Sequence, residues 1–270
     1  MTVRARSGAH GVREYLRSLW LVSARDLKVR YSTSWLGYLW SVLDPLVMSA
    51  IYWFVFTQVF QRGVGQEPYI LFLISALLPW VWFNTSISDF TRAFQIDAKL
   101  VRSTAIPRSI WVARTVLSKG VEFLLSLPVL LIFIVVAGIT QGWGVVSIGW
   151  GVLWIPVAVA LQALLLLGLG LIIAPLCVLF RDLERTAKLV LRALFYASPI
   201  IYGIGDLPDG FGWLEYANPL AGLFALYRAG FFPEQLVAGP VISAAVIAVA
   251  LFLIGMRVMR ALERPILKEL

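Results

Sequence analysis

The stretch FLLSLPVLLIFIVVAGITQGWGVVSIGWGVLWIPVAVALQALLLLGLGLIIAPLCVLF, residues 123–180, contains no charged side chain. A transmembrane helix needs about 20 consecutive, mostly apolar residues, so this run is too long for one span and fits two. Four glycines between Gly138 and Gly149 favour a turn in its middle. The stretch therefore predicts two membrane-spanning helices, 110–137 and 150–180, joined by a short connection.

The composition of the whole chain also indicates a membrane protein. Of its 270 residues 60% are hydrophobic and only 14% are charged, and the mean hydropathy is +0.85. Soluble domains carry about 25% charged residues, so this chain has too little polar surface for a soluble fold. The only cysteine, Cys177, excludes an intramolecular disulfide and a cysteine-based metal cluster.

The gaps between charged residues outline six spans and predict an all-α integral membrane protein with a transmembrane domain over residues 35–256. The predicted spans are 35–60, 68–88, 110–137, 150–180, 183–204 and 236–256. The fifth span has the shortest uncharged run, 193–205. It reaches full length only if Lys188 and Arg192 extend their charged groups to the cytoplasmic interface.

The basic residues predict the orientation of these spans. Six spans place both termini on one side of the membrane. On that side the Lys and Arg residues fall in four segments: 1–34, 89–122, 181–192 and 257–270. The other side has only Arg62 and Arg228, so the positive-inside rule places both termini in the cytoplasm. The net charge of +8 alone would also suit nucleic-acid binding, but the basic residues lie between apolar spans, so we expect none.

Three of the segments outside the spans are the two ends of the chain and the stretch between the fifth and sixth spans. The cytoplasmic tail 1–34 contains an amphipathic helical pattern over 12–30, which predicts a helix in the membrane interface; a solvated tail helix is the alternative. Residues 205–235 mix aromatic and charged side chains, which predicts short re-entrant, gate-like helices on the extracytoplasmic side, with an ordinary ordered loop as the alternative. Residues 257–270 form a second cytoplasmic tail.

Aromatic and hydroxyl side chains recur every three or four residues on two of the predicted spans. Aromatic rings stack on the apolar faces of sugars, and hydroxyls hydrogen-bond to sugar hydroxyls. Such stripes suit a sugar pathway, although helix packing also explains them. The candidate pathway residues are Tyr38, Ser41, Ser49, Tyr52 and Phe56 on the first span and Arg192, Tyr196 and Tyr202 on the fifth.

Motifs for catalysis are missing from the sequence. It contains no GxxxxGK[ST] phosphate loop, so the chain does not bind ATP in the P-loop manner. It also lacks HExxH, GxSxG and CxxC. We expect no enzyme activity, no metal and no cofactor on this chain.

Three regions resemble the permease subunit of type-2 ABC exporters for cell-surface polysaccharides, the group that exports O-antigens, teichoic acids and mycobacterial galactan. The first runs from Arg30-Tyr31 through SWLGYLWSVLDPLV at 34–47 to Phe60. The second joins LFLISALLPWVWFNTSIS at 71–88 to KLVRSTAIPRS at 99–109. The third joins CVLFRDLERTAKLVLRALFYASPIIY at 177–202 to NPLAGLFALYR at 218–228. The chain departs from the family at Asp44, where Asn is usual, and at Ile106, where an aromatic residue is usual.

The resemblance implies an assembly and a cargo. It implies a homodimer in the bacterial cytoplasmic membrane, with two copies of a separate ATPase subunit that binds ATP and Mg. The cargo would be a polyprenyl-pyrophosphate-linked glycan that moves outward between the two permease copies, surrounded by membrane lipid. A type-2 ABC permease for a drug, an antibiotic or another lipid is one alternative. A membrane-embedded enzyme is another, but it would need convergent acidic or histidine residues.

The loop 89–109 is the segment that the resemblance identifies as the coupling helix. Its apolar residues have roughly helical spacing, so a short amphipathic helix there would enter a groove on the ATPase. Pro107 ends the segment. The turn 181–188 would make a second contact. The candidate contact residues in the loop are Phe94, Asp97, Leu100, Arg102 and Arg108.

Overall fold

The computed structural model describes residues 9–32, 39–59, 68–104, 106–144, 146, 148–203, 206–208 and 210–270. These residues are nearly all helical, and no strand occurs among them. The α-helices are α1 (Ala9–Ser32), α2 (Trp40–Trp53), α3 (Tyr69–Phe90), α4 (Ala93–Ile96), α5 (Ala98–Ser103), α6 (Ser109–Gln141), α7 (Ile155–Leu179), α8 (Leu183–Ala197), α9 (Trp213–Ala217), α10 (Pro219–Arg228) and α11 (Ala238–Glu269). The predicted all-α class is confirmed for this part of the chain.

Four helical segments are long and apolar enough to cross a membrane on their own. They are α3, α6, α11 and the segment Trp150–Leu179, in which a 3-10 turn leads into α7. They overlap four of the six predicted spans, each of which contains a long uncharged run. Helices α6 and α11 extend beyond these runs into charged sequence. The chain is therefore an integral membrane protein with several spans.

The other two predicted spans contain shorter helices. In the first, α2 has 14 residues and continues as a π-helical turn over Phe54–Val59. In the fifth, α8 has 15 residues and ends at Ala197, so that Ser198 to Gly203 is not helical. Ser198 is extended because a residue before a proline, here Pro199, avoids the helical region. At about 1.5 Å per residue, α8 is about 22 Å long, shorter than the hydrocarbon core of about 30 Å.

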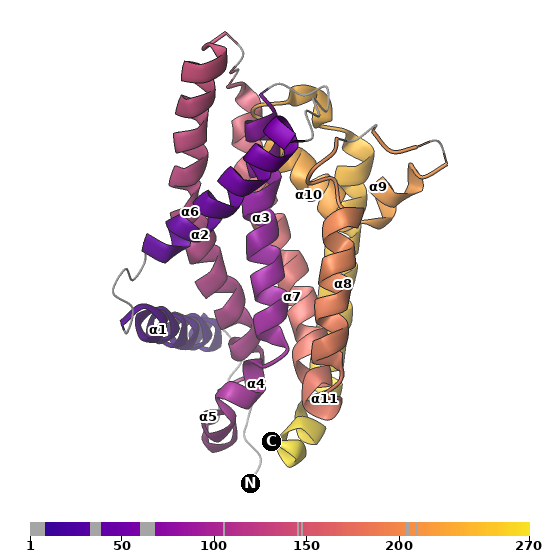
Figure 1. Cartoon of the computed structure of the whole chain (residues 1–270). Helices are drawn as coiled ribbons and strands as arrows, with labels where there is room; N and C mark the ends of the chain where they lie inside the picture. The colour runs from indigo at the N-terminus through magenta and orange to yellow at the C-terminus, as the bar shows by residue number, and fades with distance from the viewer. Residues whose placement is uncertain are drawn as a thin grey trace.

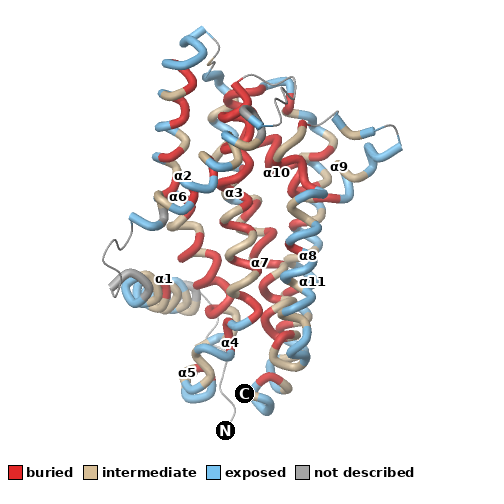
Figure 2. Tube along the Cα trace, viewed as in Figure 1, coloured by how far each residue is buried: buried red, intermediate tan, exposed pale blue. Residues whose placement is uncertain are grey.

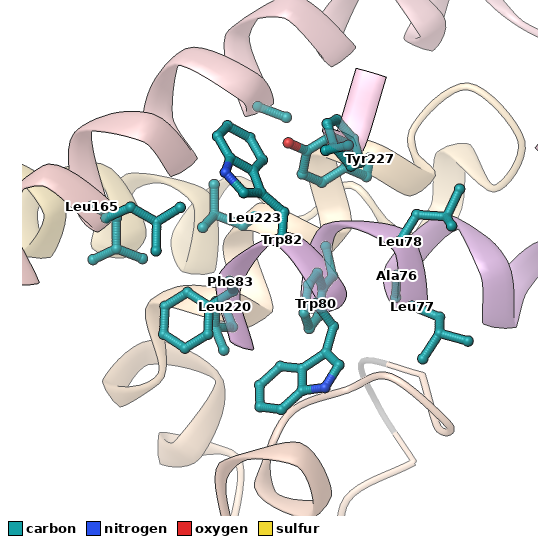
Figure 3. Packing of buried hydrophobic residues seen from close by; sticks show 14 of the residues in the cluster. Ala76, Leu77, Leu78, Trp80, Trp82, Phe83, Leu165, Leu220, Leu223 and Tyr227 are labelled. Atoms are coloured by element: carbon teal, nitrogen blue, oxygen red, sulfur yellow. The ribbon is translucent and has the colours of Figure 1, made fainter. Parts of the chain in front are cut away.

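The centre of the bundle is built around α3 and α7. Figure 2 shows that both are buried along much of their length, whereas α8 and the far end of α6 are largely exposed. Trp82 of α3 stacks on Phe123 of α6 at 5.2 Å between ring centroids, and Phe123 meets Tyr227 of α10 edge-on at 5.8 Å. Figure 3 shows Trp82 and Tyr227 within this apolar cluster.

Helices α7 and α11 pack at backbone contact. A Cβ atom on Gly168 would lie 2.6 Å from the backbone nitrogen of Phe252, and one on Gly255 would lie 2.5 Å from the carbonyl oxygen of Gly168. Small residues allow this approach in membrane helices, where close van der Waals packing drives association. The two glycines therefore explain why α7 and α11 share one long interface.

The two ends of the bundle are different (Figure 1). One end holds α4, α5, the turn between α7 and α8, and the C-terminus, and α1 lies across the bundle nearer to this end. The opposite end holds α9, α10 and the connection from α6 to α7. The segments predicted to be cytoplasmic therefore gather at one end.

Candidate functional site

The two predicted aromatic stripes meet in the structure. The ring of Tyr52 on α2 lies 5.9 Å from that of Phe195 on α8, measured between centroids. Phe195 also contacts Trp80 of α3 at 5.4 Å and its neighbour Tyr196 at 5.2 Å, both edge-on. Tyr196 is 69% exposed. Helices α2, α3 and α8 thus converge on one aromatic cluster that has an open side.

The remaining predicted pathway residues have different environments. Tyr38 lies outside the described residues, and the side chains of Ser41 and Phe56 are not described. Ser49 is fully buried, so it faces the interior of the chain. Arg192 is exposed on α8, and Tyr202 is half-buried in the turn that follows α8.

Helix α8 presents most of its surface outward, since Leu191 alone among its residues is buried. Its basic residues Arg185, Lys188 and Arg192 continue the spacing of three or four residues that starts at Arg181 and ends at Tyr196. Residues at these intervals share one helix face. Lys188 pairs with Glu184 at 2.8 Å, whereas neither Arg185 nor Arg192 has an ion-pair partner among the described residues. The exposed face therefore carries a basic track that leads to the aromatic cluster.

The loop between α3 and α6 is fixed to the bundle by two of its predicted contact residues. Phe94 is only 1% exposed and packs into the core. Asp97 forms an ion pair with the buried Arg114 of α6. Leu100 is half-buried, and Arg102 is exposed in the last turn of α5. Among the described residues of the loop, Ile96 is a large apolar side chain that is 72% exposed and therefore available to a partner.

The last of these residues, Arg108, lies at the start of α6. Its Nη1 donates to the carbonyl oxygens of Thr104 at 2.8 Å and Ile106 at 2.6 Å. Its Nε is buried and has no hydrogen-bond partner in the described part of the chain. The Arg108 side chain therefore stabilises the backbone at the end of the loop, and its Nε has no hydrogen bond in the described part of the chain.

The turn between α7 and α8 joins this loop to form one surface. Arg92 pairs with Glu184, and this hydrogen bond and ion pair raise the pKa of the Arg92 guanidinium. The amide nitrogen of Gln95 donates to the carbonyl oxygen of Cys177 at 3.4 Å. A polar cavity of about 440 Å³ lies between them, and the chain end at Leu270 contributes to its lining. We name the exposed residues of α4, α5 and this turn the coupling surface.

Charged residues also occur well inside α6. Lys119 is buried and pairs with Glu122 at 2.9 Å, as its position three residues earlier predicts, and with Asp89 of α3 at 3.7 Å. A cavity of about 280 Å³ beside this group is lined by Asp44 of α2 as well. Ionisable groups inside membrane segments pair with one another because an isolated charge is costly there. This group fixes α3 against α6 next to α2.

At the opposite end, Arg228 of α10 is 1% exposed and ties three segments together. Its three guanidinium nitrogens donate to carbonyl oxygens of Phe72 at 3.2 Å, Pro199 at 2.7 Å and Ile200 at 2.8 Å. The three hydrogen bonds to backbone carbonyl groups compensate for the burial of the guanidinium group. Asn218 caps α10 and donates to Ser198 Oγ at 2.8 Å. Helix α10 is thereby fastened to the end of α8.

Comparison with known proteins identifies the family. The family described as ABC-2 type transporter matches residues 17–232. The chain belongs to this family. An O-antigen export system permease protein RfbA from Klebsiella pneumoniae is 36% identical over 208 residues, 77% of each chain. The RfbA of Myxococcus xanthus is 31% identical over 231 residues, 84% of this chain and 85% of that protein. The polysialic acid transport protein KpsM of Escherichia coli is 22% identical over 265 residues, 97% and 99% of the two chains.

The family match confirms the resemblance drawn from the sequence, and it covers all the regions on which that resemblance rested. In this ABC-2 transporter chain, sequence reasoning did not single out Phe195, Ile96 or Arg228. Phe195 directly precedes the stripe residue Tyr196, so this aromatic pair can be read from the sequence. No sequence signal marks Arg228, because its partners are backbone carbonyl groups.

Proposed function

We propose that this chain is the membrane-spanning permease subunit of an ATP-driven exporter, and that its cargo is a polysaccharide carried on polyprenyl pyrophosphate. The observation that carries the proposal is the exposed face of α8, where Arg185, Lys188 and Arg192 lead to Tyr196 and the aromatic cluster. A guanidinium group can form two parallel hydrogen bonds to two oxygens of one phosphate. Aromatic rings can stack on the apolar faces of sugar rings. One helix face thus offers both chemistries that this cargo needs.

The position of Arg192 supports a hydrated pathway. It lies nine residues after Leu183, about 14 Å along α8 at 1.5 Å per residue. An exposed arginine at that depth is costly against lipid, and such residues face a water-filled cavity or a protein partner. A second copy of the chain, placed against the exposed sides of α2 and α8, would enclose the basic track between two permease subunits.

The named functions of the relatives favour a glycan cargo. Two of them export O-antigen and one transports polysialic acid. An O-antigen, a galactan or a teichoic-acid-like polymer fits the same site. A permease for a drug, an antibiotic or another lipid is the alternative, and it would not depend on the aromatic cluster.

The assembly that we propose is a homodimer with two copies of an ATPase subunit. The sequence has no phosphate loop, so ATP and Mg would be bound by the partner. The coupling surface offers Ile96 and the exposed charge of Arg102 to that partner. The ion pair between Arg92 and Glu184 would let one docking event act on α3, α6 and α8 together.

The topology that we propose has six spans and both termini in the cytoplasm of a bacterium. Helix α2 with its π-helical turn is the first span and α8 is the fifth. The short helices α9 and α10 would lie at the extracytoplasmic end and complete the fifth span, which is too short by itself. Helix α1 would lie in the cytoplasmic interface.

Reconstitution tests the proposed function. The chain and its ATPase partner would be placed in proteoliposomes, and ATP-dependent movement of a polyprenyl-pyrophosphate-linked glycan would be measured. We expect export by the complex and none by either protein alone. Arg192→Gln should slow export several-fold, while Arg257→Gln, on an exposed face of α11, should not. Stimulation of ATP hydrolysis by a drug-like lipid but not by the glycan would favour the alternative.

A further inference from the structure

A cavity of about 500 Å³ lies on the side of the bundle formed by α1, α6, α7 and α11, and none of the proposed pathway residues lines it. Its wall is apolar, with Leu167 and Leu171 from α7 and Phe252, Met256 and Met259 from α11. Its volume falls in the range of about 300–1,000 Å³ that is typical of ligand sites. The cavity is therefore large enough for part of a lipid-sized molecule.

The cavity is lined by about two turns of α11 and has one charged end. From Phe252 to Arg260 is eight residues, so the lining extends about 12 Å along α11 at 1.5 Å per residue. The end near Arg260 is also lined by Arg108 and Glu263. This is the end of the bundle that holds α4, α5 and the C-terminus (Figure 1). An apolar cavity with a charged mouth at this level matches the polarity of an acyl chain below its headgroup.

Helix α1 closes the cavity on one side. Tyr15 lines the cavity, and its hydroxyl lies 3.3 Å from Ser109 Oγ, which fixes α1 over the start of α6. The exposed face of α1 carries Arg13 and Arg17. A basic amphipathic helix of this kind lies at the boundary between headgroups and acyl chains, and the mouth of the cavity is therefore at headgroup level.

The mouth of the cavity has an excess of positive charge. Arg108 and Arg260 face a single carboxylate, that of Glu263. Nη1 of Arg108 donates to two carbonyl groups and its Nε is buried, which leaves Nη2 as the remaining nitrogen without a hydrogen bond among the described residues. Within the same part of the chain, no side chain pairs with Arg260. Two guanidinium groups with free donors complement a phosphodiester.

We propose that this cavity binds one anionic phospholipid of the cytoplasmic leaflet. Its acyl chain lies along Leu167, Phe252 and Met256, and its phosphate is held by Arg108 and Arg260. Bound there, the lipid attaches α1 to α6 and α11. The proposal rests on the cytoplasmic orientation given above, but not on the identity of the cargo.

Photolabelling in nanodiscs tests the site on the unmodified protein. The permease in complex with its ATPase partner would be placed in phosphatidylcholine with a small fraction of phosphatidylglycerol that carries a diazirine on one acyl chain. We expect labelling of the peptides that contain Leu167–Leu171 and Phe252–Met259. Unlabelled phosphatidylglycerol should reduce it several-fold, and added phosphatidylcholine should not. Equal competition by both lipids, or labelling only elsewhere, overturns the proposal.

A pair of double variants tests the charged mouth. Arg108→Gln with Arg260→Gln should reduce labelling about tenfold, because two charge-assisted contacts with phosphate are lost. Arg257→Gln with Arg264→Gln removes the same charge from exposed positions on α11 that do not line the cavity, and labelling should be unchanged. Full labelling of the first variant overturns the proposal. Stronger competition by a polyprenyl phosphate than by phosphatidylglycerol would also overturn it and make the cavity a cargo site. Because labelling does not require export, its failure is distinct from failure of the proposed function.

Discussion

The guanidinium carbon of Arg228 lies 3.5 Å from the centre of the Phe72 ring. The cation therefore has an aromatic face on one side and backbone carbonyl oxygens around its edge. This arrangement connects the start of α3, the end of α8 and α10 through one side chain. Loss of the Arg228 side chain would therefore remove the contacts that hold α3, the end of α8 and α10 together at this end of the bundle.

Arg228→Gln should lower the melting temperature of the purified protein substantially. The change removes the guanidinium donors of the Pro199 and Ile200 carbonyl groups, while the Phe72 carbonyl still accepts from Ser75 Oγ. Each buried carbonyl group left unsatisfied costs about 1–3 kcal/mol. Arg257→Gln removes a charge from an exposed position and should leave the melting temperature unchanged. Differential scanning fluorimetry in detergent measures both. Equal melting temperatures would show that the contacts of Arg228 add nothing to stability.

Variants of the aromatic cluster should change the rate of export without changing the stability of the protein. Tyr52→Ala combined with Tyr196→Ala should slow glycan export by about tenfold or more, since each stacking ring contributes about 1 kcal/mol by analogy with base stacking. Tyr196 is mostly exposed, so its loss should hardly change the melting temperature. Trp150→Ala removes an exposed ring from the connection between α6 and α7, away from the aromatic cluster, and serves as the control. Normal export by the double variant would mean that these rings only pack.

The coupling loop gives a matched pair of variants two residues apart. Phe94→Ser should destabilise the protein by about 3–5 kcal/mol, because it empties a buried aromatic site. Ile96→Ser should leave the melting temperature intact and weaken capture of the ATPase partner in a pull-down. Arg102→Gln tests the neighbouring exposed charge in the same assay. Full partner binding by the Ile96 variant would place the coupling contact elsewhere.

Cysteine labelling tests the topology with few complications, since the native Cys177 is buried. In a Cys177→Ser background, Gln141→Cys should react with an impermeant maleimide from outside and Ser103→Cys only after the membrane is opened. Gln141 is preferable to Gly142, because the positive φ of 96° at Gly142 disfavours any side chain there. External labelling of Ser103→Cys would contradict six spans.

The presence of four spans could be predicted from the sequence because a long apolar run marks each of them. Charged residues do not mark the helix ends, since α6 contains Arg114, Lys119 and Glu122 near its start. The predicted span 68–88 became α3, Tyr69–Phe90. The predicted 236–256 became α11, which continues as a helix to Glu269, since helical propensity does not stop where the bilayer stops. The fifth span could not be drawn correctly, because hydropathy does not register the change of backbone at Ser198 before Pro199.

The candidate site was predicted less completely than the fold. Helical spacing identifies residues that share a face, but it does not say which neighbour that face meets. Ser49 belongs to the same stripe as Tyr52 yet is fully buried. Phe94 was selected as an exposed apolar contact, but it faces the core, and Ile96 takes the exposed position. Contacts between separate helices, such as Tyr52 with Phe195, have no trace in a single sequence.

The contact of Gly168 with Gly255 determines which parts of the molecule are free to move. Two backbones at van der Waals distance leave no side chain to rearrange between them, so α7 and α11 form a rigid anchor in the bilayer. Helix α8 buries only Leu191, so we expect it to move more easily than α7 and α11. A push on the coupling surface should therefore swing α8 while α11 stays still. The width of the pathway beside α8 would then depend on how far α8 can turn before the hydrogen bond from Arg228 to the Pro199 carbonyl oxygen breaks.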